Sequence, residues 1–197
     1  IPTPERIFQV EHRELVAEFP PLKTLNDRPN NLPTQTSELV GRDRELREIR
    51  DLLADPGVRL LTLIGPGGIG KTRLARELVR SVGEEATVLQ GHCPSYGEGI
   101  TFWPLREIVE QVGDLSEALD GEGDADAIAD RILGGVGLSG RETTNEETFW
   151  AARKLFEALA RRRPLVVLLE DAHWAERAVL DLVEHIVEWS NDAPIVF

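Results

Sequence analysis

The sequence predicts an α/β domain in which helices cover both faces of a mostly parallel β-sheet, in three layers. Apolar runs of strand length alternate along the chain with segments of helical periodicity. One run, residues 164–171, has five consecutive apolar residues after a proline, which is typical of a strand buried on both faces. Strands that alternate with helices form such parallel sheets.

The first 37 residues differ from the rest of the chain. They are rich in proline, asparagine and threonine, with prolines at positions 20, 21, 29 and 33. Prolines at this density exclude a continuous helix or a central strand. The sequence therefore predicts an extended linker over residues 1–37 and a single domain over residues 38–197.

The domain begins with a predicted helix. Its apolar face consists of Leu46, Ile49, Leu52 and Leu53. Pro56 and Gly57 end this helix. A buried strand is then predicted at 59–64, a helix at 71–82 and a second strand at 86–91.

The later elements continue the alternation. They are helices at 103–113, 124–133 and 143–163, a strand at 164–171, a helix at 175–189 and the start of a strand at 195–197. Thr144 and Glu147 have the spacing of a capping box, in which each side chain bonds the backbone amide of the other residue.

Composition limits the classes of function. The formal net charge of −13 argues against a broad nucleic-acid-binding surface. No apolar run reaches the length of a membrane span, so no membrane contact is expected. Cys93 is the single cysteine, which excludes an internal disulfide and fits a reducing cytoplasm. We expect Cys93 to be a small core residue rather than a nucleophile.

The ends of the chain lead to one further expectation. The chain has no methionine, starts at Ile1 and stops at Phe197 inside a predicted strand. We therefore expect a piece of a longer protein whose sheet is truncated at the C-terminus. An open strand edge favours self-association.

The strongest motif joins the strand at 59–64 to the helix at 71–82. It has the complete G-x4-G-K-[ST] pattern, formed by Gly65, Pro66, Gly67, Gly68, Ile69, Gly70, Lys71 and Thr72. Glycines allow the backbone amides to turn toward phosphate oxygens, and the start of the next helix adds positive potential. Lys71 is expected to reach the β- and γ-phosphates of ATP, and Thr72 to supply a hydroxyl to Mg²⁺.

An acidic pair follows the buried strand. Glu170 and Asp171 stand where a P-loop protein needs one carboxylate near Mg²⁺ and a second one near the attacking water. Lys71, Glu170 and Asp171 are therefore the predicted catalytic residues, and Thr72, Glu170 and Asp171 the predicted Mg²⁺ ligands. Which of the two acids holds the metal is left open.

Together, "GPGGIGKTRLA" and "LLEDAHWA" resemble the STAND class of signalling ATPases, within the AAA-like P-loop proteins. The chain is similar to the ATPase modules fused to bacterial class III nucleotide cyclases and to LuxR-type transcription regulators. "LVGRDREL" matches the entry motif of that group, which implies that Val40, Gly41 and Arg42 lie near the nucleotide. Arg73, the residue after the P-loop motif, is also predicted to bind the nucleotide. "GHCPSYGEGITFWPLREIV" matches the cyclase-linked branch, and the linker resembles the tail of a cyclase domain.

The resemblance implies a nucleotide switch whose state is read by effector domains of the same longer chain. ATP with Mg²⁺ is the implied cofactor, hydrolysis to ADP and phosphate the implied reaction, and no cyclase activity is expected. The family often has Asp-Asp where this chain has Glu170-Asp171, and Glu176 replaces a more usual aspartate. His173 and Trp174 either couple the nucleotide state to a neighbouring surface or pack after the strand. A non-hydrolysing nucleotide-binding scaffold and a small-molecule P-loop kinase are the alternatives.

Overall fold

In a computed structural model of the chain, the described residues are 41–55, 57–65, 69–83, 85–95, 101–190 and 192–197. They belong to one compact unit, Leu39–Phe197. The predicted linker lies outside the described residues, and the predicted boundary between residues 37 and 38 stays a prediction. No helix in the described ranges has the length and apolar character that a bilayer crossing requires.

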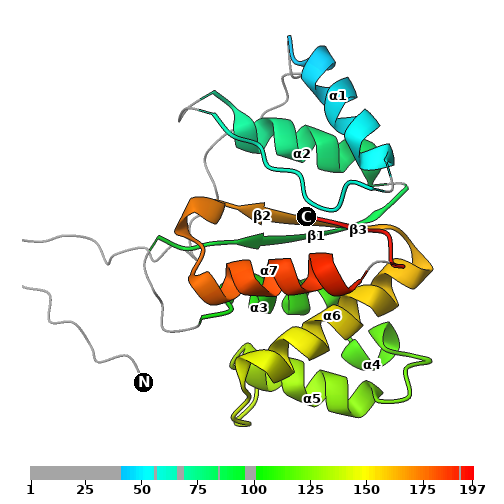
Figure 1. Ribbon diagram of the computed structural model, residues 1–197, viewed down its shortest axis with the longest axis vertical. Helices are drawn as coiled ribbons and strands as arrows, with labels where there is room; N and C mark the ends of the chain where they lie inside the picture. Colours follow the sequence, from blue (N-terminus) through cyan, green and yellow to red (C-terminus); the bar gives the residue numbers. More distant parts are fainter. Residues whose placement is uncertain (1–40, 56, 66–68, 84, 96–100, 191) are drawn as a thin grey trace, which may run out of the picture. The chain divides into compact units, whose positions relative to one another are not determined.

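A small parallel sheet lies at the centre of this unit (Figure 1). Its strands are β1 (Thr87–His92), β2 (Leu165–Glu170) and β3 (Ile195–Val196), in the order β1-β2-β3, with both pairs parallel. In this register His92 lies beside Glu170, the last residue of β2. The α/β class with a parallel sheet is confirmed, whereas the three-layer description and the C-terminal truncation stay predictions.

The prediction of a regular strand at 59–64 is wrong. Only its first part pairs with the sheet: Phe197 donates its N–H to Arg59 O at 3.1 Å, and Leu61 donates to Phe197 O at 2.9 Å. This is the bonding pattern of parallel neighbours. Residues 62–64 have no partner strand among the described residues, and Ile64 is 88% exposed. An apolar run becomes a strand only where a second strand bonds its backbone.

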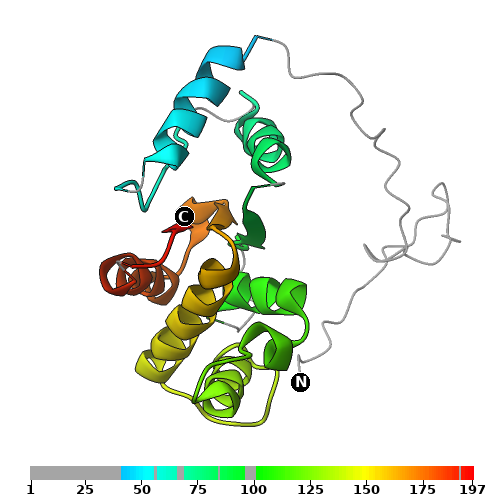
Figure 2. The ribbon, with the colours of Figure 1, turned by 90° about the vertical axis from the view of Figure 1, so that its right-hand side faces the viewer.

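Seven α-helices surround the sheet in the described part of the chain. They are α1 (Asp43–Ala54), α2 (Lys71–Val82), α3 (Trp103–Val112), α4 (Leu115–Ala118), α5 (Ala125–Gly135), α6 (Asn145–Arg162) and α7 (Arg177–Trp189). Figures 1 and 2 show α1 and α2 on one side of the strands and α3, α6 and α7 on the other. The predicted helices are confirmed within a few residues. The short helix α4 was not predicted.

Local sequence signals explain where several helices begin. Helix α6 starts with the predicted capping box, in which Glu147 N–H donates to Thr144 Oγ1 at 3.2 Å and Thr144 N–H donates to Glu147 Oε2 at 3.1 Å. Helix α4 is capped by Asp114, whose side chain accepts hydrogen bonds from the backbone N–H groups of Ser116 and Glu117. A four-residue helix of this kind has too few residues to show an apolar period.

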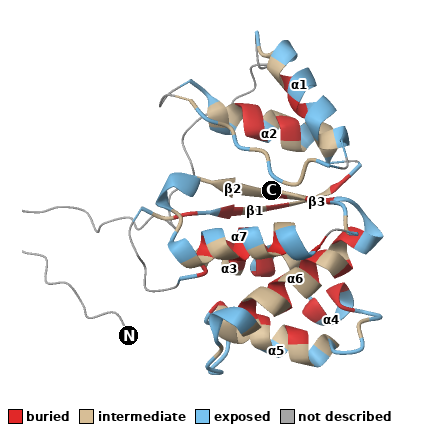
Figure 3. Ribbon diagram, in the orientation of Figure 1, coloured by how far each residue is buried: buried red, intermediate tan, exposed pale blue. Residues whose placement is uncertain are grey.

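Two apolar clusters hold the elements together (Figure 3). The larger one joins β1 and β2 to helices α3, α5, α6 and α7, and includes the fully buried side chains of Phe156 and Ile186. The smaller one joins α1 to α2 through Leu46, Ile49 and Leu74. This second cluster fixes α2, and with it the start of the helix at Lys71, against α1.

The α6–α7 interface contains a half-buried histidine. The His185 ring stacks on Trp189 with centroids 6.2 Å apart, and its buried Nε2 atom has no hydrogen-bond partner among the described residues. Burial is the main cause that lowers the pKa of His185, with Arg153 acting in the same direction and Glu188 and Glu157 opposing it. The folded chain therefore favours the neutral imidazole.

Candidate functional site

The phosphate-binding motif lies between the segment paired with β3 and helix α2. Gly70 is the N-cap of α2 and has a left-handed backbone with φ 84°, a conformation that glycine adopts without steric cost. A Cβ atom at Gly65 would meet Cδ1 at the tip of the Ile69 side chain, which lies directly over this glycine. Pro66, Gly67 and Gly68 lie outside the described residues.

The start of α2 is built to attract an anion. Lys71 and Thr72 are its first two residues, and its first turn has no acidic side chain. A helix start without acids keeps the positive potential of its free N–H groups. Lys71 Nζ donates to Gly65 O at 2.6 Å, so the ammonium group folds back over the loop. Thr72 is exposed, and Arg73 in the same turn is half-buried.

Arg42 contacts the same loop from the start of α1. Its guanidinium group donates to Ile69 O at 3.2 Å and to Glu45 Oε1 at 2.9 Å. The pKa of Glu45 is lowered mainly because its carboxylate bonds its own backbone amide, and secondly because it bonds Arg42. These bonds keep the carboxylate ionised. Gly41 has φ 81°, and Val40 lies outside the described residues. The entry motif and the P-loop are therefore joined by a side-chain bond.

The acidic pair occupies the end of β2. Glu170 is half-buried and is the last strand residue, whereas Asp171 is exposed. Asp171 has φ 54° and ψ 36°, the left-handed region that few side chains adopt. Its carbonyl accepts from Trp174 N–H at 2.8 Å, which closes the short helical turn Ala172–Trp174.

Gly65, the start of α2 and the acidic pair lie at the same edge of the sheet, where parallel strands have their carboxyl ends. All the strands are parallel, and both features follow the carboxyl ends of strand segments. Strand β3 separates them, because it pairs with β2 on one side and with Arg59–Leu61 on the other. Open α/β sheets bind their ligands at this edge.

The donor set fits Mg²⁺ carried by a nucleotide. Mg²⁺ in phosphate sites takes one or two protein oxygens and completes its shell with phosphate and water. Thr72, Glu170 and Asp171 supply such oxygens. Within the described ranges, no group of three or more histidine, cysteine or acidic side chains is arranged to hold a metal by itself. The nucleotide-binding and metal-binding roles of these residues stay predictions.

A pocket of about 480 Å³ adjoins Glu170. Its walls come from β1 and α3, and are formed by Gln90, Gly91, His92, Glu107, Glu110, Gln111 and Glu170. His92 Nδ1 and Glu107 Oε1 are 2.6 Å apart. Neither His92 nor Glu107 was among the residues predicted from sequence to form the site. The segment from residue 91 to 109 was noted only as a family motif, and nothing in it marks the two side chains as neighbours.

His173 and Trp174 follow the acidic pair on the surface. Trp174 is 52% exposed, and its ring lies 5.0 Å from the His173 ring. Trp174 lines a smaller pocket of about 100 Å³ together with Trp103 and Cys93. The cysteine is 2% exposed, which confirms the prediction of a core residue. Burial raises the pKa of its thiol to about 11, and the carboxylate of Asp171 contributes in the same direction.

Comparisons with known proteins identify the family of the chain. A family model described as AAA ATPase domain matches residues 38–197. An uncharacterized protein of Rhizobium meliloti is 31% identical in an alignment of length 171, and the match covers 74% of this chain and 16% of the relative. Uncharacterized proteins of Mycobacterium tuberculosis and Mycobacterium bovis are 42% identical over 57 residues, which cover 29% of this chain and 14% of each relative. The chain thus spans 14% to 16% of the length of these relatives. No solved structure matches it.

Proposed function

Because this chain belongs to the AAA ATPase domain family, we propose that it binds ATP together with Mg²⁺ and hydrolyses ATP to ADP and phosphate. The observation that carries the proposal is that the start of α2 and the acidic pair lie at one edge of a parallel sheet. A triphosphate held at the start of α2 would extend its terminal phosphate along that edge, toward the end of β2.

Each residue has a proposed task. The amides at the start of α2 and the Lys71 ammonium hold the β- and γ-phosphates, and binding exchanges the Gly65 carbonyl for phosphate as the partner of Lys71. Thr72 and Glu170 hold Mg²⁺, which neutralises charge on the phosphates when it is bound. Asp171 orients the attacking water and accepts its proton. Arg42 keeps the loop closed through its bond to Ile69 O.

We further propose that this ATPase is the nucleotide switch of a larger signalling protein. The support is the resemblance to modules fused to cyclases and transcription regulators, and the small share of the relatives that this chain spans. In such a protein, ATP would stabilise one arrangement of domains by binding it more tightly than the other. Cytoplasmic location and effector domains in the same chain belong to this proposal.

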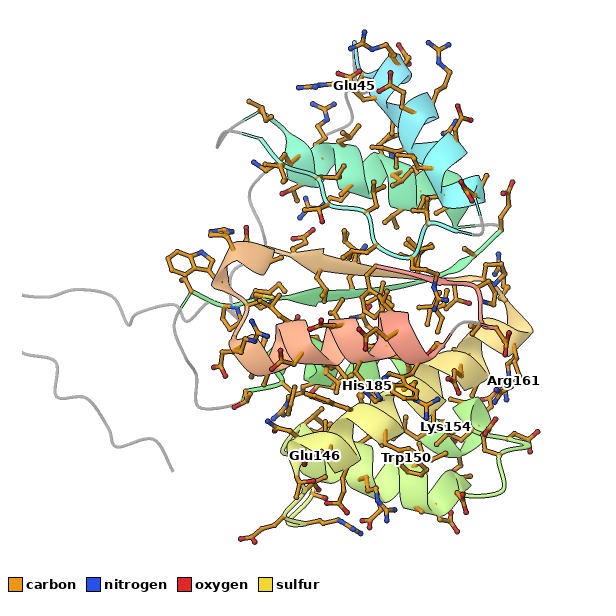
Figure 4. The ribbon with its side chains drawn as sticks, in the orientation of Figure 1. Glu45, Glu146, Trp150, Lys154, Arg161 and His185 are labelled. Carbon is orange, nitrogen blue, oxygen red and sulfur yellow. The ribbon has the colours of Figure 1, made fainter. Side chains whose placement is uncertain are left out.

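ATP binding is tested with Lys71→Ala. A charge-assisted bond contributes about 1.5–3 kcal/mol, which corresponds to a roughly ten- to hundred-fold loss of affinity. The matched control is Lys154→Ala. Lys154 lies on α6, across the sheet from α2 (Figure 4), and its Nζ atom is 3.5 Å from Glu157. The measurement is a titration of both variants with a fluorescent ATP analogue at fixed Mg²⁺, and equal affinities would remove Lys71 from the site.

The proposed roles of Glu170 and Asp171 can be distinguished by replacing each carboxylate with the corresponding neutral amide. Glu170→Gln should weaken the Mg²⁺ dependence of ATP binding, because it removes a carboxylate from the metal site. Asp171→Asn should leave ATP binding intact and lower single-turnover hydrolysis by about 10²–10⁴-fold. The opposite pattern would exchange the two roles. Tight ATP binding without any turnover in the parent chain would favour the non-hydrolysing scaffold instead.

A further inference from the structure

The outer edge of strand β1 faces away from the rest of the sheet. Within the described part of the chain, β1 pairs only with β2. The flanking bonds, Thr87 N–H to Pro164 O at 2.7 Å and Cys93 N–H to Glu170 O at 3.0 Å, show that odd-numbered residues face β2. In a parallel ladder the backbone groups of alternate residues point to opposite sides, so Gln90 and His92 point outward.

Gln111 of α3 binds the outward backbone groups of Gln90. Its Oε1 accepts from Gln90 N–H at 3.0 Å, and its Nε2 donates to Gln90 O. One side-chain amide thus makes both bonds that the backbone of a neighbouring strand would make. Gln111 Nε2 also donates to Glu107 O at 2.9 Å, one turn earlier in α3, which fixes its orientation.

Glu107 binds the next outward residue. Its Oε2 accepts from His92 N–H at 2.7 Å, while its Oε1 accepts from Trp103 Nε1 at 3.1 Å and contacts the His92 ring. Glu107 and Gln111 are four residues apart and therefore lie on the same face of α3. The helix presents two hydrogen-bonding side chains at the spacing of two successive outward residues of β1.

Gly91 allows α3 to come this close. A Cβ atom at Gly91 would lie 2.6 Å from Pro104 O and 2.9 Å from Pro104 Cβ, so only glycine fits beneath the first turn of α3. Pro104 itself is buried. The absence of a side chain at Gly91 thus lets α3 pack close enough for Glu107 and Gln111 to bond the outer edge of β1.

We propose that Glu107 and Gln111 form an edge guard that prevents β1 from pairing with β1 of a second copy of this chain. An unpaired strand edge is a template for another strand, and native proteins cover or charge such edges. A second copy is the occupant to which the proposal commits. Without the two side chains, the outward groups of Gln90 and His92 lose these bonds in every copy, and a two-fold axis would set two such β1 edges against each other. The proposal does not depend on nucleotide binding.

The test is the double variant Glu107→Ala/Gln111→Ala of the 197-residue chain. We expect it to dimerise at least tenfold more tightly than the parent in sedimentation velocity over a range of concentrations. The matched control is Arg106→Ala/Glu110→Ala, which removes the ion pair at 3.0 Å from the same helix but no bond to β1. The control should sediment like the parent. Self-association of the control to the same extent as the guard variant would overturn the proposal.

Hydrogen exchange of single variants tests the bonds directly and covers the case in which the double variant does not fold. Gln111→Ala should lower the protection of the Gln90 amide, and Glu107→Ala that of the His92 amide, each by about tenfold, the factor for one hydrogen bond. Glu107→Gln keeps an acceptor and should restore the protection of His92. Unchanged protection in both alanine variants, or a folded double variant that remains as monomeric as the parent, would overturn the edge guard.

Discussion

The left-handed backbone of Asp171 allows its conformational role to be separated from its chemical role. Asp171 is the one non-glycine residue with positive φ in the described part of the chain, at φ 54°. Its side chain is exposed, so substitutions there change few packing contacts. The test compares Asp171→Asn, Asp171→Gly and Asp171→Ala, all of which remove the carboxylate.

The magnitude follows from the backbone alone. A left-handed conformation costs an ordinary L-residue roughly 1–2 kcal/mol, whereas glycine adopts it freely and asparagine and aspartate tolerate it. We therefore expect Asp171→Ala to lower the free energy of unfolding by about 1 kcal/mol relative to Asp171→Asn. Asp171→Gly should be at least as stable as Asp171→Asn. With a urea dependence of about 1–3 kcal/mol per molar, the alanine variant unfolds about 0.3–1 M earlier.

The assay is urea unfolding followed by circular dichroism, with single-turnover ATP hydrolysis measured on the same samples. All three variants should lose turnover by a similar factor, because each lacks the carboxylate, while their stabilities differ. An alanine variant as stable as the asparagine variant would refute the backbone argument. Normal turnover in the asparagine variant would refute the role of Asp171 in positioning water.

Three further predictions concern the fold around the site. Gly91→Ala should destabilise the chain by about 1–3 kcal/mol through overpacking against Pro104, whereas Gly140→Ala, which has open space around it, should be neutral in the same urea assay. Cys93 should react with a thiol reagent at pH 8 only as fast as the chain opens, because burial raises the pKa of the thiol to about 11, and fast labelling of folded protein would contradict this. Burial lowers the pKa of His185, so the unfolded chain takes up a proton first as pH falls below about 6.5. The urea midpoint should therefore fall between pH 7.5 and 5.5, and this fall should shrink in His185→Phe.

Several features could be predicted from sequence because neighbouring residues determine them. The glycines before Lys71 and the apolar period after it place the start of α2 at the position that the structure shows. Thr144 and Glu147 start α6 by bonding each other's backbone across three residues. The apolar run before Glu170 is long enough to need burial on both faces, which identifies β2. In each case the interaction that decides the structure is local.

Other features depend on residues that meet only in the folded chain. Four of the six residues in segment 59–64 are apolar, but the segment pairs only at Arg59–Leu61, where Phe197 reaches it. Glu107 and Gln111 bind the edge of β1 across 15 and 21 residues of sequence, and no local pattern marks an ordinary helical glutamate or glutamine as a strand partner. The G-x4-G-K-[ST] motif and the acidic strand end can be recognised without a structure, since their residue types and spacing are what predict the chemistry. The position of His92 beside Glu170 and that of α3 against the outer edge of β1 come from folding, because strand register and helix packing bring together groups that are far apart along the chain.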